Sequence, residues 1–576
     1  MVNSLKKRGQ KFLKQFSRVS LKASEEGKEH IKENLIGRIS HVANIRLLIF
    51  EWGLLVFALI MLAVTQAFWF GDSYANDTFV AGGTYIEGTI GKVNSLNPLF
   101  ATTSSEKTLS RLLFSTLTTI DYSGNVGMGL AKSVTPSENG KVWTMKLREG
   151  LKWSDGEPLT KDDVIFTLKL VQNSAVGSIY SSNLTNVKVS EGEEGEIIFT
   201  LPSAYADFMS ALNIPVVPKH KLENADPRNL IENDFSNTPV TSGAFVLNAI
   251  QAAEGDGRIV YLSVNRNYYR GTALVSSFAV HTFSSHDEII SALNSGTITA
   301  SAELSGTETE KVISAAIYQK ESSLNSGVFI FFNTTSSTFK NIEVRRAVRM
   351  GISLEKVRAA APGTTSLDFP LLKSAIVLTS YPSLPEYNLE AAREKIKSLV
   401  EEGKEIQVAT VKTGYLPEVS EALKNELEEL GLNVNVSVYE ENQDFISNII
   451  AKRNYDILVY ETPLGADPDP LPYYHSSQAT SSGLNLANYR NALVDDLLIG
   501  ARETLDGNLR AAKYESFLNY LNSDVPTIGL YQTNLTYFYN KNVRTFGDNV
   551  RLVTELDRFS DILNFSADKE TRNKTP

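Results

Sequence analysis

The segment from Lys141 to Val171 limits the possible fold of this chain more than any other part of its sequence. From Trp143 to Leu147 apolar and polar residues alternate, which is the period of a half-buried strand. Ser154-Asp155-Gly156 supplies the residue types that a tight turn needs. Thr160 and Asp163 then form the S/T-x-x-D/E pattern that caps the start of a helix. The segment therefore predicts a strand, a turn and a helix in immediate succession.

The rest of the chain is large enough for more than one such unit. A chain of 576 residues is expected to form two or three compact units, and 42% hydrophobic residues can fill their cores. The chain has no cysteine, which excludes disulfides, thiolate metal sites, cysteine nucleophiles and a lipid-modified cysteine anchor.

A different kind of attachment is indicated near the N-terminus. Residues 52–70 carry no charge, and at about 1.5 Å per residue they span roughly the 30 Å of a hydrocarbon layer. Residues 1–46 hold 11 Lys and Arg against 4 Glu. The positive-inside rule then predicts a basic cytoplasmic tail (1–46), a transmembrane helix (47–70) and a cell-membrane protein whose bulk lies outside the cytoplasm. Residues 71–82 are expected to form a linker.

A cleaved signal peptide is the alternative, because Ser73-Tyr74-Ala75 loosely resembles a cleavage site. We favour an uncleaved anchor because the basic region is about 45 residues long and the apolar run exceeds the usual 7–15 residues.

Further elements follow along the chain. Residues 83–100 predict a strand, 104–117 a helix, and 525–540 a strand pair. Residues 405–440 predict a strand–helix–strand unit with parallel strands, because Pro417 and Gly431 stand at the favoured ends of a helix.

The residues that catalysis usually needs do not come together in the sequence. The six histidines are scattered, and neither HExxH nor G-x-S-x-G occurs. Asp162-Asp163 and Asp495-Asp496 fit a helix N-terminus and a solvated helix face better than a catalytic pair. We therefore expect no enzyme activity, no cofactor, no metal site and no nucleic-acid partner.

Several segments, in this order, resemble one family. Besides 141–171 they are IPVVPKHKL (214–222), TPVTSGAFVLNAI (238–250), LSVNRNYYRG (262–271) and LNSGTI (293–298), the last without the acids usual there. Together they resemble the peptide/nickel-binding family (solute-binding protein family 5) of ABC-importer extracellular solute-binding proteins. The resemblance covers about residues 80–565. It implies an α/β, two-lobed periplasmic-binding-protein-like (Venus flytrap) fold with an extra subdomain.

The same resemblance implies an organisation and a function. Lobe 1 with the extra subdomain would span 83–300, lobe 2 301–524, and 525–565 would return to lobe 1, ahead of a disordered tail (566–576). The implied protein is a monomer that captures oligopeptides between its lobes and delivers them to ABC transporter permease subunits. The alternatives are the same fold binding a metal chelate or an oligosaccharide, a receptor or scaffold without transport, and an exported hydrolase.

The resemblance also implies site residues. In peptide binders of the family, an acidic residue of a D-P loop pairs with the ligand's amino terminus, and residues 457–478 match that loop. Asp467 is the first choice for this role and Asp469 the second. Glu461 is a further candidate, because it stands where the family has G-W. The alternative is that Asp467-Pro468-Asp469-Pro470 is only a rigid turn.

Other positions are carried over in the same way. Lys92 and Asn94 end the first strand, where family members contact ligand. Ser242 and Gly243 are expected near the cleft. Tyr531 is either an aromatic ligand contact or a core residue, and His475 either touches ligand or hydrogen-bonds locally.

Overall fold

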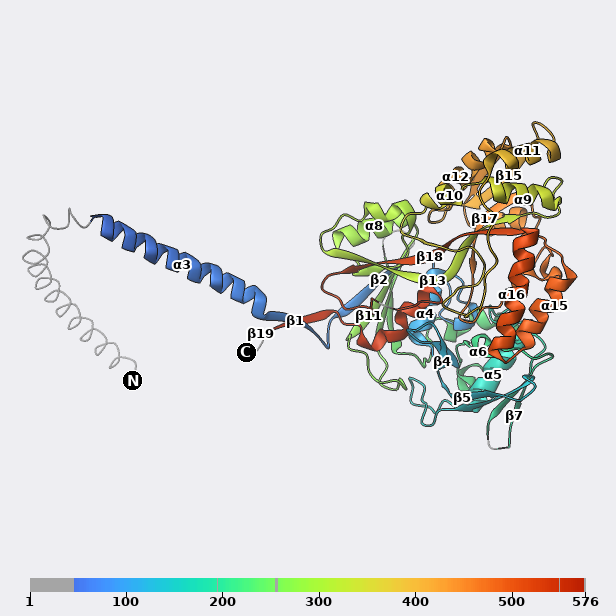
Figure 1. Ribbon diagram of the computed structural model, residues 1–576. Helices are drawn as coiled ribbons and strands as arrows, with labels where there is room; N and C mark the ends of the chain where they lie inside the picture. Colours follow the sequence, from blue (N-terminus) through green and yellow to red (C-terminus); the bar gives the residue numbers. More distant parts are fainter. Residues whose placement is uncertain (1–45, 194, 254–256, 549, 574–576) are drawn as a thin grey trace, which may run out of the picture. The chain divides into compact units, whose positions relative to one another are not determined.

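The computed structural model describes residues 46–193, 195–253, 257–548 and 550–573. Contacts divide the chain into two units (Figure 1). Phe79–Lys569 form one compact unit, and Met1–Thr78 with Glu570–Pro576 form the other.

The terminal unit contains helix α3 (Arg46–Tyr74) and most of the pairing between strands β1 (Ala75–Val80) and β19 (Asp568–Asn573). Within the described residues, no helix combines the length and apolar character that crossing a membrane requires. The predicted span at 47–70 is therefore not confirmed, and the predicted basic tail lies outside the described residues apart from Arg46. β19 occupies part of the segment predicted to be a disordered tail.

The compact unit is organised around an eleven-stranded mixed sheet. Its strands are, in spatial order, β16 (Asn433–Tyr439), β15 (Glu405–Val411), β17 (Ile457–Pro463), β13 (Ile317–Phe332), β18 (Thr527–Asn540), β12 (Ala300–Ser301), β2 (Thr84–Ile90), β11 (Ser277–Phe283), β10 (Arg258–Val264) and β9 (Phe245–Ala252), with β14 (Thr365–Ser366) beside β18. A separate sheet has the order β5 (Ala131–Pro136), β6 (Val142–Leu147), β8 (Ile197–Thr200) and β7 (Lys188–Glu191). A two-stranded sheet pairs β3 (Thr118–Ile120) with β4 (Val126–Met128).

The longer helices pack around these sheets. They are α4 (Ser104–Leu113), α5 (Lys161–Gln172), α8 (His286–Ser295), α9 (Ile342–Gly351), α10 (Leu354–Ala359), α11 (Leu389–Leu399), α12 (Leu416–Glu429), α15 (Ala492–Glu503) and α16 (Gly507–Asp524). In Figure 1, α9, α10, α11 and α12 gather at one end of the compact unit, and β5 and β7 lie at another.

Two long antiparallel strands, β13 and β18, connect two separate hydrophobic cores (Figure 1). Leu324 and Leu535 belong to the N-terminal core, which contains the helices α4 and α5. Val328 and Tyr531, only a few residues away on the same strands, belong to the C-terminal core of residues 328–531. The register shifts between Ser323 and Gly327, where one core gives way to the other. The lobe boundaries given above stay predictions.

The local predictions for residues 141–171 are confirmed. Trp143 and Met145 are buried on β6, and Gly156 takes φ +95° in the turn. Thr160 and Asp163 form a reciprocal capping box at the start of α5. The predicted parallel strands of residues 405–440 are also confirmed, as β15 and β16 on either side of α12.

The strand pair predicted for 525–540 is wrong, because the structure has the single strand β18 there. No glycine or proline interrupts residues 530–540, and both halves of the strand find a partner in the continuous strand β13. A chain with partners along its whole length has no reason to turn.

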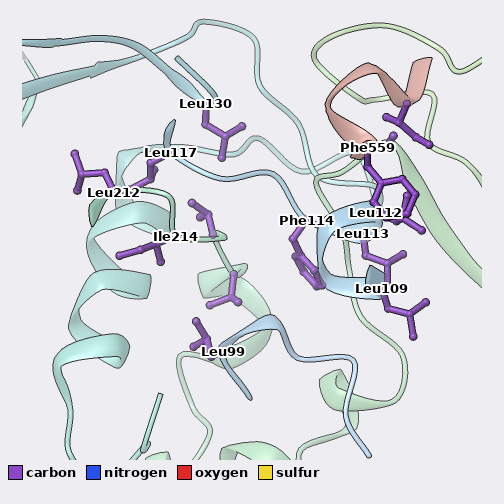
Figure 2. Packing of buried hydrophobic residues seen from close by; sticks show 14 of the residues in the cluster. Leu99, Leu109, Leu112, Leu113, Phe114, Leu117, Leu130, Leu212, Ile214 and Phe559 are labelled. Carbon is purple, nitrogen blue, oxygen red and sulfur yellow. The ribbon is translucent and has the colours of Figure 1, made fainter. Parts of the chain in front are cut away.

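Helix α4 shows how the N-terminal core is built. Thr103 and Glu106 form its capping box, and its apolar face packs into the cluster shown in Figure 2. Leu109, Leu112 and Leu113 lie there close to Phe114. The helix ends at Leu113, four residues before the predicted end, and the chain continues in an extended conformation at Phe114.

Candidate ligand-binding cleft

Two adjoining cavities lie where the two cores meet. The larger has a volume of about 630 Å³ and the smaller about 140 Å³. They share lining residues from segments far apart in the chain, namely Ser305, Thr413, Gly414, Asn534, Thr536 and Glu555. The cavities are therefore two parts of one cleft.

Several chain segments form the walls, among them β13 with Glu321, Leu324 and Val328. On the side of the N-terminal core, residues 302–311 follow β12 and include the short 3-10 helix η6 (Gly306–Lys311). On the side of the C-terminal core, residues 412–418 turn from β15 into α12. The middle of β18 and the end of β17 close the smaller cavity. The two walls touch at Gly306 and Gly414, where a Cβ on Gly306 would lie 2.5 Å from the Gly414 carbonyl oxygen.

The structure brings two of the sequence-predicted site residues, Glu461 and Tyr531, into the lining of the smaller cavity. Glu461 lies on β17 and accepts hydrogen bonds from the hydroxyls of Ser326 (2.6 Å) and Thr533 (3.0 Å). Burial raises the pKa of Glu461, and the two hydrogen bonds oppose this shift. Burial also raises the pKa of Tyr531. A half-buried carboxylate with only hydroxyl donors suits a positively charged guest.

Glu303 supplies a comparable carboxylate in the larger cavity. The Ser104 hydroxyl donates to its Oε1 atom. Burial, reinforced by the nearby charge of Glu555, raises the pKa of Glu303 to about 7.

Asp467 and Asp469 lie instead in a loop held by the helices α15 and α16. The Arg510 guanidinium lies 2.6 Å from Asp467 Oδ2, and Arg502 Nε donates to Asp469 Oδ2 at 2.9 Å. Tyr514 also donates to the carbonyl oxygen of Pro468 at 2.7 Å. Neither aspartate is found among the described residues that line the two cavities. The geometry is that of a turn fixed by charge pairs, and a ligand-binding role for either stays a prediction.

Ser242 and Gly243 pack against the end of α4. Ser115 N–H donates to Ser242 Oγ at 3.0 Å, and Gly243 N–H donates to the Leu113 carbonyl oxygen at 2.8 Å. A Cβ on Gly243 would lie 2.5 Å from the Leu112 carbonyl oxygen. This close backbone approach explains the glycine without a ligand.

The remaining predicted site residues are likewise not brought to the described walls of the cleft. Lys92 and Asn94 follow β2 and belong to the turn that Glu106 organises, where Asn94 N–H donates to Glu106 Oε1 at 2.8 Å. His475 ends the short helix α14 (Leu471–Tyr474) and accepts from Ser477 N–H at 3.0 Å. Their roles as ligand contacts stay predictions.

Sequence reasoning missed most of the cleft walls. Glu303 follows the LNSGTI segment by five residues, and nothing in that segment marks it as a cleft residue. Glu555 and Thr536 gave no local signal either. Thr536 reaches the cleft on β18, which crosses from one core to the other, and Glu555 reaches it at the start of the 3-10 helix η9 (Glu555–Asn564).

Two α/β cores joined by crossing strands, with a cavity between them, define a ligand-binding protein of the periplasmic-binding-protein fold. The comparisons with known proteins agree. Residues 125–484 match the bacterial extracellular solute-binding proteins, family 5, and the chain belongs to this family. It is therefore a solute-binding protein and not an enzyme.

Relatives and solved structures extend the likeness beyond the matched range. The oligopeptide-binding protein AppA of Bacillus subtilis is 25% identical over 484 residues, which are 79% of this chain and 87% of AppA. Its structure in complex with a nonapeptide has a TM-score of 0.69 at 22% identity, covering 85% of this chain and 99% of that one. CtaP of Listeria monocytogenes has a TM-score of 0.74 at 22% identity, with 84% and 99% covered. NikZ of Campylobacter jejuni in complex with Ni(L-His) has a TM-score of 0.70 at 22% identity, again with 84% and 99% covered.

Proposed function

We propose that this protein captures oligopeptides in the cleft between its two cores and delivers them to the permease subunits of an ABC transporter. The observation that carries the proposal is the cleft itself, with the Glu461 carboxylate in its smaller cavity. The name of AppA and its complex with a nonapeptide support oligopeptides as the ligand class.

A peptide presents an ammonium group, a carboxylate and a row of backbone donors and acceptors. Glu461 is the partner of the ammonium group, because no basic side chain among the described residues lies within ion-pair distance of it. Asp467 is already paired with Arg510, so a ligand would first have to displace that guanidinium. Capture then needs only contacts that are better in the closed cleft than in an open one.

Attachment to the membrane is a further part of the proposal. Residues 47–70 hold the protein at the membrane, with the compact unit outside the cytoplasm. In the described part of α3, the side chains of Phe50, Trp52 and Phe57 are 67%, 62% and 63% exposed, which is costly in water. Retention of the protein in carbonate-washed membranes, together with an intact N-terminal mass, is the expected result. A mature protein that starts near residue 75 would instead show a cleaved signal peptide.

Native mass spectrometry of the full-length chain in detergent tests the ligand class, because it weighs whatever is bound. We expect masses that fragment into amino acids and that leave the protein unchanged on release. A bound sugar, or the absence of any peptide under saturating peptide mixtures, would contradict the proposal.

Two matched variants test the choice of carboxylate. Glu461→Gln should weaken peptide binding at least tenfold in calorimetry, while Asp467→Asn should leave the affinity within a few-fold of the native value. A loss of affinity in Asp467→Asn but not in Glu461→Gln would show that Asp467, and not Glu461, binds the ammonium group.

A metal chelate is the alternative ligand, because the NikZ structure holds Ni(L-His). Among the described residues, no group of three His, Asp or Glu side chains is arranged to hold a metal. A metal would therefore have to arrive with its own chelator, and the mass of the bound species would identify it.

A further inference from the structure

The larger cavity carries more negative charge than one peptide ammonium needs. Its lining contains the carboxylates of Glu303, Glu308, Glu418 and Glu555. The same lining contains only two lysines, and both are matched by acids outside it. Lys311 Nζ lies 3.5 Å from Asp287, and Lys412 Nζ lies 3.6 Å from Glu440.

One of the four carboxylates has a basic partner in the same wall. Glu308 Oε1 lies 2.8 Å from His286 Nδ1. For Glu303, Glu418 and Glu555, no Lys, Arg or His of the described chain lies within ion-pair distance. Arg558 is the cation that acts on Glu303 from further away, but its Nε already donates to Glu87 at 3.1 Å.

These charges also act on each other within the cleft. Glu555 raises the pKa of Glu303 in the larger cavity and that of Glu461 in the smaller one. Both cavities thus lie in one field of negative charge, which a guest with two separated cationic groups would neutralise better than a guest with one.

Thr536 is an independent sign of a guest in this space. It is only 8% exposed and lines both cavities, yet in the described part of the chain its hydroxyl has no hydrogen-bond partner. Its hydroxyl is not among the described buried polar atoms without a partner, so it is open to the cavity, and the ammonium or guanidinium group of a guest donates well to a hydroxyl oxygen.

We propose that the larger cavity is a second cation subsite, which takes a lysine or arginine side chain of the bound peptide through Glu303, Glu418, Glu555 and the Thr536 hydroxyl. The carboxylates are spread along the wall rather than gathered into a metal-binding group, and this arrangement suits a long flexible organic cation. The inference rests on the proposed function: Glu461 takes the α-ammonium, and the second subsite makes the protein selective for basic peptides.

Calorimetry on the full-length chain with three tripeptides tests the proposal. The probes are Ala-Lys-Ala, Ala-norleucine-Ala and Ala-Glu-Ala. Norleucine keeps the four-carbon chain of lysine without its charge, so the first two peptides differ only in the group that the subsite is proposed to bind. We expect Ala-Lys-Ala to bind at least tenfold more tightly than Ala-norleucine-Ala, and Ala-Glu-Ala to bind more weakly still.

Variants locate the effect. Glu303→Gln and Glu555→Gln should each reduce the preference for lysine over norleucine several-fold. Glu394→Gln removes an exposed carboxylate of α11 and serves as the matched control, with the preference intact. A variant that misfolds would lose binding of all three peptides alike. The other glutamine variant, together with the three affinities of the native chain, would then still show whether the subsite exists.

The second subsite and peptide capture itself can be refuted separately. If all three tripeptides bind with similar affinity, or the acidic one binds best, the second subsite is refuted and peptide capture stands. If no peptide binds while another class of solute does, the proposed function fails and the subsite fails with it.

Discussion

Substitution of Gly306 by alanine should weaken ligand binding by acting on the closed cleft alone. Gly306 is buried, takes φ +59° and opens η6 on the wall of the N-terminal core. A Cβ at this position would lie 2.5 Å from the carbonyl oxygen and 2.7 Å from the carbonyl carbon of Gly414, which belongs to the opposite wall. Both are backbone atoms, so they cannot move aside as a flexible side chain can.

The size of the effect follows from these distances. The walls must separate by roughly 0.5–1 Å to restore ordinary contact, and overpacking of this kind costs about 1–3 kcal/mol. The positive φ of alanine adds about 1–2 kcal/mol of strain, but this strain is the same in open and closed forms and cancels from the affinity. At about 1.4 kcal/mol per tenfold, we expect ligand binding to weaken about 5- to 140-fold.

Calorimetric titration of the full-length chain, with the peptide identified by mass spectrometry, measures this loss. Gly403→Ala is the matched control, because Gly403 takes φ +77° and has no atom within 4 Å of the added Cβ. Both variants should lose thermal stability through strain, and only Gly306→Ala should lose affinity. Equal affinities for both variants would refute the view that contact between Gly306 and Gly414 belongs to the ligand-bound, closed state.

Three further outcomes concern stability. Gly243→Ala would place a Cβ 2.5 Å from the Leu112 carbonyl oxygen. The variant should lower the free energy of unfolding in urea by about 1–3 kcal/mol and leave peptide affinity unchanged, and a loss of affinity at native stability would contradict the packing role. Arg558→Met leaves the carboxylate of Glu87, which is 0% exposed, without its cation and should lower the free energy of unfolding by about 3–5 kcal/mol. The double variant with Glu87→Gln should recover a large part of this stability, and no recovery would show that the unpaired charge is not the cause. The pKa of Glu303 is raised from 4.5 to about 7, so between these pH values the folded protein holds a proton that the unfolded chain releases. The free energy of unfolding should therefore fall as pH rises from about 4.5 through 7. Glu303→Gln should reduce this dependence on pH, and the same dependence in the variant and the native protein would contradict the raised pKa.

Local signals in the sequence were sufficient for the elements that depend on near neighbours. The capping box of Thr160 and Asp163, and the proline and glycine at the ends of α12, act within one helical turn and are visible without a structure. The single strand β18 was not predictable in this way. Its continuity depends on β13, whose residues lie some 200 positions earlier in the chain.

The site divides along the same line. Glu461 could be named as a candidate from the sequence because it stands where the family has G-W, ahead of the D-P loop. The sequence could not show that Asp467 and Asp469 face Arg510 and Arg502, since those pairs join positions 43 and 33 residues apart through the packing of α16 and α15. Both aspartates found by the motif are therefore already paired in this structure, and a ligand-binding role for either stays a prediction.

The unpaired carboxylates connect ligand charge to closure of the cleft. Glu303 and Glu555 come from the side of the N-terminal core, whereas Glu418 and Glu461 come from the side of the C-terminal core. Bringing these walls together without a guest concentrates like charges in a space where burial weakens screening by solvent. A cationic guest turns this electrostatic repulsion between the walls into attraction, because each wall is then attracted to the positive charge between them. On our proposal that the guest is a basic peptide, the same residues oppose closure of the empty cleft and favour closure once the peptide is bound, which would give selectivity and closure one electrostatic origin.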